Sequence, residues 1–73
     1  MTTNATRGRS VRRAIMAVAT ACAQRGLPLP FNAQIGAALG IDASVVCRHM
    51  NRMMDEGAFN VRREGRRVFV EIA

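Results

Sequence analysis

This 73-residue sequence contains no lysine, no tryptophan and no tyrosine, and its only aromatic residues are three phenylalanines. So few aromatic side chains fit a small helix-rich core better than an all-β sandwich. At the same time 49% of the residues are apolar, which is too many for a disordered tail. The length suits one small domain, close to the lower limit for burying enough surface to fold alone. The sequence therefore predicts a single compact domain with short connections.

Cysteine and long apolar runs are also scarce. Cys22 and Cys47 each fall in a segment predicted as helix, and neither has a second Cys or His at ligand spacing. This spacing disfavours a zinc site and a disulfide framework, and it predicts reduced thiols and no cofactor. The longest uncharged helical run, residues 14–24, is about half of the ~20 residues that a membrane span needs. The N-terminus lacks the apolar core of a signal peptide, so we expect a cytoplasmic, nucleoid-associated protein without a membrane partner.

Acidic residues are the third shortage. Five Asp and Glu face eleven basic residues, all of them Arg, and the net charge is +6 with a pI near 11.6. The planar guanidinium presents a fork of donors that matches phosphate oxygens and guanine edges, so the charge excess favours a nucleic-acid partner. A solvated basic surface, or a GC-rich genome that favours Arg over Lys, is the alternative explanation. Nucleic acid is the better one because the arginines cluster where a DNA-binding fold would use them.

The N-terminal part of the chain divides into an arm and a helix. Residues 1–9 are small, polar and basic without apolar periodicity, which predicts a flexible basic arm. Ser10 is suited to cap a helix that ends at Gly26. The residues predicted to form its buried stripe are Val11, Ile15, Val18 and Cys22. Arg12 and Arg13 then fall in the first turn, where the helix dipole disfavours cations, and we interpret them as contacts to a phosphate.

A connector and a short helix follow. Residues 27–30 (LPLP) cannot be helical, because alternate prolines remove donors and push their neighbours toward extended backbone. They predict a connector with room for a short edge strand. Asn32 is placed to cap a helix over residues 33–39.

A tight turn leads into the third predicted helix. Gly40 supplies the positive φ that a turn between two helices requires, and Ile41 is its buried pivot. Asp42 is placed to cap a helix over residues 43–56. The apolar face of this helix consists of Val46, Met50 and Met53. The opposite face consists of Ser44, Arg48, Asn51 and Asp55, flanked by Val45 and Arg52.

This separation of faces is typical of a recognition helix, which places its N-terminal half in the major groove of DNA. Ser44 and Arg48 are the predicted base readers, since Arg pairs with guanine O6 and N7. Asn51 and Arg52 lie further along and are predicted to meet phosphates, and Val45 is placed to touch a thymine methyl. A solvated helix face is the alternative for any one of them. His49, the only histidine, is interpreted as a partly buried packing residue.

Beyond Gly57 the apolar period changes from 3.6 to 2, which predicts a β-hairpin. We expect strands over residues 58–63 and 66–72 around a turn at Glu64 and Gly65. Its predicted buried side consists of Phe59, Val61, Val68, Val70 and Ile72, whereas Phe69 has the opposite parity. Near the tip lie four cations, Arg62, Arg63, Arg66 and Arg67, which repel one another unless an anion is nearby. A DNA backbone or minor groove would supply that anion, and protection of an edge strand is the alternative.

Three segments resemble a known family. Residues 38–53 (ALGIDASVVCRHMNRM) place a turn glycine and a capping residue before an amphipathic helix, residues 54–59 (MDEGAF) lead into the hairpin, and residues 62–70 (RREGRRVFV) carry its arginines. Over residues 11–72 the chain resembles a minimal winged helix-turn-helix transcriptional regulator of the ArsR/MarR sort. The resemblance implies regulation of transcription by an operator-binding homodimer. It implies no metal site, because Cys47 stands alone where ArsR-type sensors carry clustered ligands.

Together these observations predict an α+β winged helix-turn-helix domain over residues 10–73, with three helices followed by a two-stranded β-hairpin, the wing. We expect a sequence-specific regulator that binds double-stranded DNA, with helix 43–56 in the major groove and the wing on the backbone or minor groove. Two alternatives stay open: a module that docks RNA polymerase or another regulator, and a non-specific architectural DNA binder. An enzyme is the least favoured class, because no catalytic set appears at suitable spacing.

Overall fold

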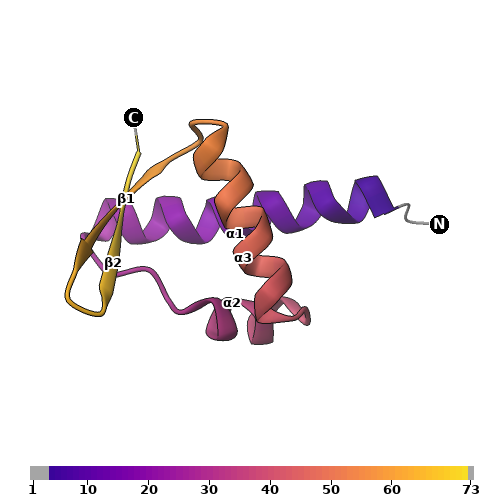
Figure 1. The fold of residues 1–73 in the computed structure, drawn as a ribbon, viewed down its shortest axis with the longest axis horizontal. Coiled ribbons are helices and arrows are strands. Elements are labelled where there is room, and N and C mark those ends of the chain that lie inside the picture. The colour runs from indigo at the N-terminus through magenta and orange to yellow at the C-terminus, as the bar shows by residue number, and fades with distance from the viewer. Residues whose placement is uncertain (1–3, 73) are drawn as a thin grey trace.

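The computed structural model describes residues 4–72 and shows three helices followed by an antiparallel β-hairpin. The helices are α1 (Asn4–Arg25), α2 (Asn32–Leu39) and α3 (Ala43–Asp55), and the hairpin, hereafter the wing, pairs β1 (Asn60–Glu64) with β2 (Arg67–Glu71). In Figure 1, α3 crosses the long helix α1, α2 lies below both, and the wing lies beside the end of α1 that is remote from the N-terminus. The predicted α+β fold class is confirmed, and the order of elements is that of a winged helix.

Helix α1 begins at Asn4, so the predicted start at Ser10 is wrong and residues 4–9 are helical rather than an arm. The first three residues of the predicted arm lie outside the described residues. Apolar periodicity indicates which face of a helix is packed, so it gives no signal where a helix extends beyond the elements that it packs against. Figure 1 shows that the first turns of α1 reach past α3 in this way. Arg12 and Arg13 consequently lie about two turns inside the helix, beyond the reach of its terminal dipole.

The end of α1 forms a Schellman motif around Gly26, whose φ is +65°. The Leu27 N–H donates to the Cys22 carbonyl over 2.9 Å, and the Gly26 N–H donates to the Ala23 carbonyl over 3.3 Å. The predicted connector follows. It forms no strand, but the Leu29 N–H donates to the Val68 carbonyl over 2.7 Å and ties the connector to β2.

Helix α2 begins at Asn32 itself, one residue earlier than predicted, so Asn32 is not its cap. Phe31 occupies the capping position, and its N–H donates to Gln34 Oε1 over 2.9 Å. The helix ends at Leu39, and Gly40 follows as its C-terminal cap with a φ of +71°, which confirms the predicted glycine turn. The Ile41 N–H then donates to the Gly36 carbonyl over 2.9 Å, which holds the turn against α2.

Helix α3 packs closely against α2 because Gly36 has no side chain. A Cβ at Gly36 would lie 2.5 Å from the Ile41 carbonyl oxygen. Asp42 occupies the predicted cap position with extended backbone, but its side chain makes no capping hydrogen bond. Its carbonyl accepts the Val45 and Val46 N–H groups instead, over 3.0 and 3.2 Å. The helix ends at Asp55, one residue before the predicted end.

The core lies between the three helices and the wing. Its buried residues are Ile15, Ala19, Leu29, Ile35, Val46, Met50, Met53, Phe59 and Val70. They confirm the predicted apolar face of α3. In the stripe predicted for the first helix only Ile15 is buried, whereas Val11, Val18 and Cys22 are half-buried and Ala19 is buried instead. Ile41 is only half-buried, so it is not the buried pivot that the sequence predicts. Ile72 was also predicted to be buried and is 41% exposed. Strand β2 ends at Glu71, so Ile72 lies past the last paired residue of the wing.

The wing has a two-residue loop, Gly65 and Arg66, one position later than predicted, because Glu64 pairs with Arg67. Gly65 has a φ of +61° at the first loop position, as a type II′ turn requires. The register places alternate residues on opposite faces of the hairpin. The inner face carries Val61, Arg63, Val68 and Val70, and the outer face carries Asn60, Arg62, Glu64, Arg67, Phe69 and Glu71.

Candidate nucleic-acid interface

The outward face of α3 carries the polar residues that the sequence predicts for it. Ser44, Arg48, Asn51 and Arg52 are all exposed, whereas Val46, Met50 and Met53 on the opposite side are buried. Such a division leaves one face of the helix free for an external partner. Arg48 and Arg52 stand one turn apart, so their guanidinium groups make this part of the helix positive.

Val45 differs from these four residues because it is half-buried. Together with Gly40 and Ile41 it lines a shallow hollow at the turn between α2 and α3. Its methyl groups therefore lie at the edge of the outward face, beside the backbone of the turn. The remaining polar residue of the face, Asp55, is exposed in the last turn of α3.

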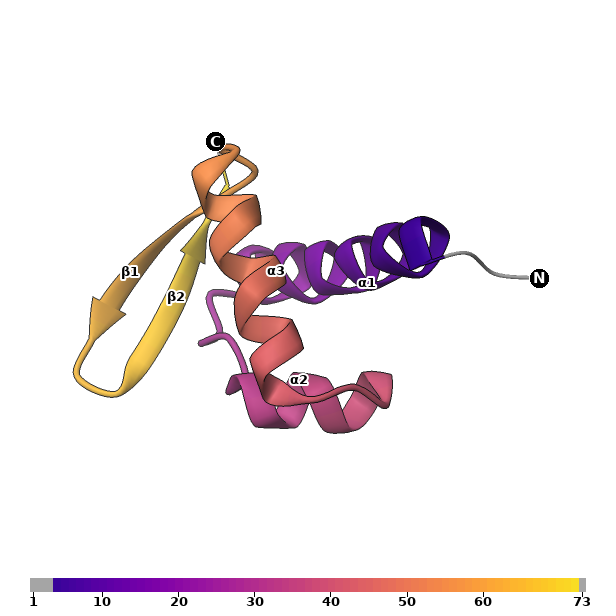
Figure 2. The same cartoon turned by 45° about the vertical axis from the view of Figure 1, so that its right-hand side comes forward.

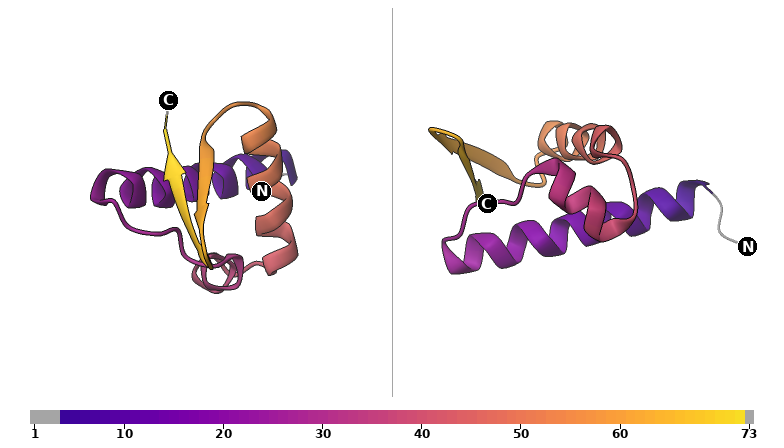
Figure 3. Two further views of the ribbon diagram at one scale, coloured as in Figure 1. Left: turned by 60° about the vertical axis from the view of Figure 1, so that its left-hand side comes forward. Right: turned by 90° about the horizontal axis from the view of Figure 1, so that it is seen from below.

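The four wing arginines do not form one cluster, because the register assigns them different positions. Arg62 and Arg67 belong to the outer face of the wing, Arg63 belongs to the inner face, and Arg66 lies in the loop. All four are exposed. Figures 1 and 2 and the left view of Figure 3 all show the loop of the wing on the same side of the molecule as α2 and the first turn of α3.

Arg62 finds partners within the wing. Its guanidinium lies 4.9 Å from the centre of the Phe69 ring, and its Nε lies 3.5 Å from Glu71 Oε1. Its terminal nitrogen also pairs with Glu64. Glu64 and Glu71 of the chain itself therefore supply part of the negative charge that relieves repulsion among the wing arginines. The same contacts occupy Phe69, whose parity is opposite to that of its apolar neighbours, as predicted.

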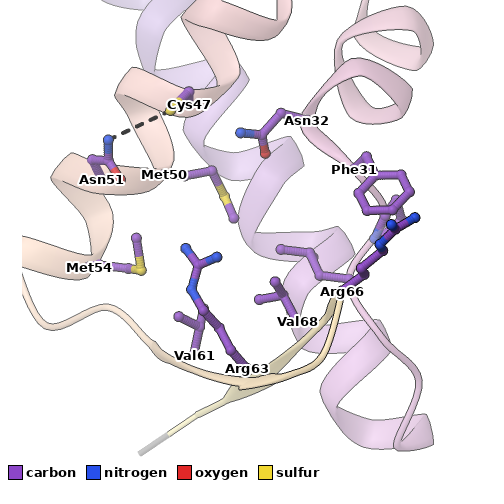
Figure 4. Close-up of a pocket in the computed structure, with 12 residues that line it drawn as sticks. Phe31, Asn32, Cys47, Met50, Asn51, Met54, Val61, Arg63, Arg66 and Val68 are labelled. Atoms are coloured by element: carbon purple, nitrogen blue, oxygen red, sulfur yellow. Dashed lines mark hydrogen bonds between the residues drawn. The ribbon is translucent and has the colours of Figure 1, made fainter.

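The inner face of the wing and α3 border a groove of about 220 Å³, which we call the wing groove. Arg63 and Arg66 contribute to its walls, and Cys47 and Asn51 contribute from α3. Figure 4 shows the Arg63 side chain directed into this space from the wing. The Asn51 amide lies 3.7 Å from the Cys47 sulfur atom. In the described part of the chain neither Arg63 nor Arg66 makes an ion pair or a hydrogen bond.

Arg12 and Arg13, the two arginines of α1 that the sequence predicts as phosphate contacts, also differ from one another. Arg12 is half-buried and pairs with Glu56, which joins α1 to the end of α3. Arg13 is exposed. A contact between Arg12 and a phosphate would thus have to compete with an existing carboxylate partner.

His49 is half-buried, as the sequence predicts for a packing residue. A Cβ placed on Gly8 would lie 3.9 Å from His49 Cε1, so the ring lies close to α1. Burial, and then the positive charges of Arg48, Arg12 and Arg52, lower the pKa of His49 below its usual 6.5. The imidazole therefore favours its neutral form in the folded protein.

Two residues near this surface were not singled out from the sequence. Phe31 is 64% exposed and lines the wing groove together with Met54. The sequence did carry a signal for Phe31, because helix caps prefer Ser, Asp or Asn and an aromatic residue at such a position is unusual. No signal could have indicated Met54, because its position beside the wing depends on how β1 and α3 pack.

Across residues 4–72 no helix is both long and apolar enough to cross a membrane. The same residues bring no three His, Cys, Asp or Glu side chains together in a metal-binding arrangement. Comparison of the chain with family models, with curated proteins and with solved structures found no significant match.

Proposed function

We propose that the protein is a sequence-specific regulator of transcription that binds double-stranded DNA. The observation that carries this proposal is the exposed polar face of α3, with Arg48 and Arg52, next to a wing whose Arg63 and Arg66 have no partner in the described chain. An α-helix fits the major groove, and unpaired guanidinium groups beside it attract the phosphate backbone. The resemblance of residues 11–72 to ArsR/MarR-type regulators supports the same function.

In this arrangement α3 enters the major groove with its N-terminal half. Arg48 pairs with a guanine through O6 and N7, and Ser44 hydrogen-bonds a neighbouring base edge. Val45 lies at the edge of the contact and approaches a thymine methyl. Asn51 and Arg52, further toward the end of the helix, bind phosphates.

The wing provides affinity. Arg63, Arg66 and Arg67 contact the adjacent backbone or minor groove, where narrow segments attract arginine. Arg62 acts by a different route, since its contacts to Phe69 and Glu71 stiffen the hairpin that presents the other three. On α1, Arg13 is the better phosphate contact, because Arg12 already pairs with Glu56.

The regulator is proposed to act as a homodimer on a two-fold symmetric operator in the nucleoid of the cytoplasm. In such dimers the two recognition helices are separated by one turn of DNA, about 34–36 Å. Selection of bound fragments from random duplexes tests this directly. A palindromic motif is expected, and recovery of asymmetric sites only would exclude the dimer.

The test of DNA binding is a salt titration on a selected site and on a random duplex. About four to six phosphate contacts predict a slope of roughly −4 to −5 in a log-log plot of affinity against salt. Arg48→Ala should reduce discrimination between the two duplexes by about 1–3 kcal/mol, whereas Arg66→Ala should weaken both alike. Arg25→Ala, which removes one exposed arginine from outside α3 and the wing, is the control for loss of one charge. A slope near zero, or equal effects of both variants on both duplexes, would refute the proposal.

A protein-interaction module is the second candidate. It is favoured by the exposed Phe31, which lines a shallow hollow with Arg66 and Arg67 and would suit an acidic surface of RNA polymerase or of another regulator. A gel shift at physiological salt separates the two functions. The interaction module should leave mixed genomic DNA unretarded. A non-specific architectural binder should retard every duplex equally and show the salt slope without a preferred site.

A further inference from the structure

The Phe31 ring lies on the surface, although the fold does not need it there. It is 64% exposed, compared with 49% for Leu27 and 41% for Ile72. The main chain of Phe31 does the capping of α2, because its N–H donates to Gln34 Oε1 and its carbonyl accepts the Gln34 and Ile35 N–H groups. A serine or aspartate at this position would add a side-chain cap, which an aromatic ring cannot provide. The ring is therefore available to a partner.

Two arginines of the wing stand beside this ring. A hollow between the connector and the wing, which we call the connector hollow, is lined by Pro28, Pro30, Phe31, Gln34, Arg66 and Arg67. Figure 4 shows the Arg66 side chain directed toward Phe31. In the part of the chain that the structure describes, neither Arg66 nor Arg67 forms an ion pair. The hollow thus combines a planar apolar surface with two uncompensated positive charges.

The ring also borders the surface proposed for DNA. Phe31 lines the wing groove as well as the connector hollow, and Asn51 of α3 lines the same groove. The wing loop lies on the same side of the molecule as the first turn of α3 in Figures 1 and 2. A nucleic-acid strand that contacts both Asn51 and Arg66 therefore passes close to Phe31.

A fully paired duplex offers no partner for the face of this ring. Its bases are stacked on one another and expose only their edges in the grooves. Its phosphates are anionic, and the face of an aromatic ring carries partial negative charge. An unpaired base, in contrast, has a free planar face, and stacking on an aromatic side chain accepts any of the four bases.

We propose that Phe31 is a stacking site for an unpaired nucleobase, and that Arg66 and Arg67 bind the neighbouring phosphates of the same strand. An aromatic ring beside positive charge is the combination with which proteins bind unpaired strands. Removal of a base from a duplex costs unstacking, so the site favours a base that is already unpaired. The protein then prefers a duplex with one unpaired nucleotide beside the α3 site, and this second part rests on the proposed function.

The stacking site is tested without a duplex, by following the phenylalanine ring signals by NMR as a deoxyadenosine trinucleotide is added. The signals of Phe31 should shift in a saturable manner, whereas those of Phe59, which is 1% exposed, should stay in place. An abasic trinucleotide carries the same phosphates without the bases. It should bind more weakly on the order of tenfold and leave the Phe31 signals nearly unchanged.

Phe31→Leu removes the ring and keeps an apolar side chain and the main-chain cap of α2, so circular dichroism should show a folded protein. It should lose the preference for the deoxyadenosine trinucleotide over the abasic one, and Phe31→Trp should increase that preference. Leu27→Ala is the matched control and should change neither affinity, because Leu27 is an exposed apolar residue that lines neither hollow. Arg66→Gln should weaken both trinucleotides alike.

Three results would each overturn the stacking site: unshifted Phe31 signals, equal binding of the abasic trinucleotide, or an unchanged preference in Phe31→Leu. An acidic peptide with a leucine anchor tests the competing occupant of the connector hollow, since it needs an apolar contact but no ring. Equal binding of this peptide by the natural sequence and by Phe31→Leu, without a response to the trinucleotide, would assign the hollow to a protein partner.

The duplex part is tested on a selected site that carries one unpaired adenine, placed at each flanking position in turn. At one position the protein should bind roughly tenfold more tightly than with an abasic residue at the same place, and Phe31→Leu should remove the difference. Equal affinities at every position overturn the preference for unpaired nucleotides and leave the stacking site intact. A protein that never binds the duplex refutes the proposed function, and the trinucleotide titration then still decides the stacking site.

Discussion

Gly36 offers a sharp test of how α2 and α3 fit together, through the substitution Gly36→Ala. Helix propensity alone predicts that this change stabilises the protein by about 0.5–1 kcal/mol, because glycine is unfavourable within a helix. The packing predicts the opposite. The new Cβ would lie 2.5 Å from the Ile41 carbonyl oxygen, which belongs to the backbone of the turn and has no rotamer through which to move away.

The magnitude follows from the displacement that this contact requires. Carbon and oxygen atoms approach comfortably to about 3.3–3.6 Å, so the turn must move by roughly 1 Å. The movement also stretches the 2.9 Å hydrogen bond from the Ile41 N–H to the Gly36 carbonyl. Overpacking of this kind costs about 1–3 kcal/mol. After subtraction of the gain in helix propensity, we expect Gly36→Ala to lower the free energy of unfolding by about 1–2 kcal/mol.

The assay is urea denaturation followed by circular dichroism at 222 nm, with thermal unfolding as a second measurement. Each kcal/mol should lower the Tm by roughly 4–8 °C in a domain of this size. Gly8→Ala is the matched control, since Gly8 also lies within a helix and its added Cβ would meet His49 Cε1 at an ordinary 3.9 Å. That variant should gain stability. If Gly36→Ala were as stable as Gly8→Ala, the close approach of α2 and the turn would be disproved.

Three further predictions concern charged residues. The pKa of His49 is lowered in the folded state, so the unfolded chain takes up the proton first, and the free energy of unfolding should fall as the pH drops below 6.5 toward the folded pKa. In His49→Gln the denaturation midpoint should depend less on pH over that interval. An unchanged pH dependence would count against the burial of the ring. The Arg12–Glu56 pair is partly exposed, with 38% and 46% of the side chains accessible, so a double-mutant cycle should give a coupling of only about 0.2–1 kcal/mol. A larger value would show that the pair is less solvated than the structure indicates. Arg62→Ala should destabilise the wing by about 0.5–1 kcal/mol through loss of the contact to Phe69, and normal hydrogen exchange in the hairpin of this variant would contradict that role.

The fold class was accessible from the sequence because its signals are local. The spacing of Val46, Met50 and Met53 is a property of one helix, and the turn at Gly40 needs only one backbone conformation. The alternation in the last third of the chain reports a strand face directly. These signals predict the type of each element and the exposed face of α3. Whether that face binds DNA stays a prediction.

Errors arose where the sequence carries no packing signal. The first turns of α1 lack an apolar stripe, so their helix was interpreted as an arm. Asn32 looked like a cap, yet the chain uses the Phe31 backbone and the Gln34 side chain at that position. Ile72 continued the alternation of the strand beyond the point where pairing stops. In each case local preference was either silent or overridden by the neighbouring elements.

By itself the sequence determined the helices, the turn, the hairpin and the positive charge, since periodicity, turn chemistry and composition act over a few residues. Only the tertiary structure decided which arginine side chains form ion pairs within the protein and which stay available to a partner. Arg12 meets Glu56 across 44 positions of the chain, and Arg62 meets Glu71 across the wing, while Arg63 and Arg66 face a groove that exists only when β1 and β2 pack beside α3. Ion pairs and grooves depend on distances between elements, and those distances are fixed by packing of the core.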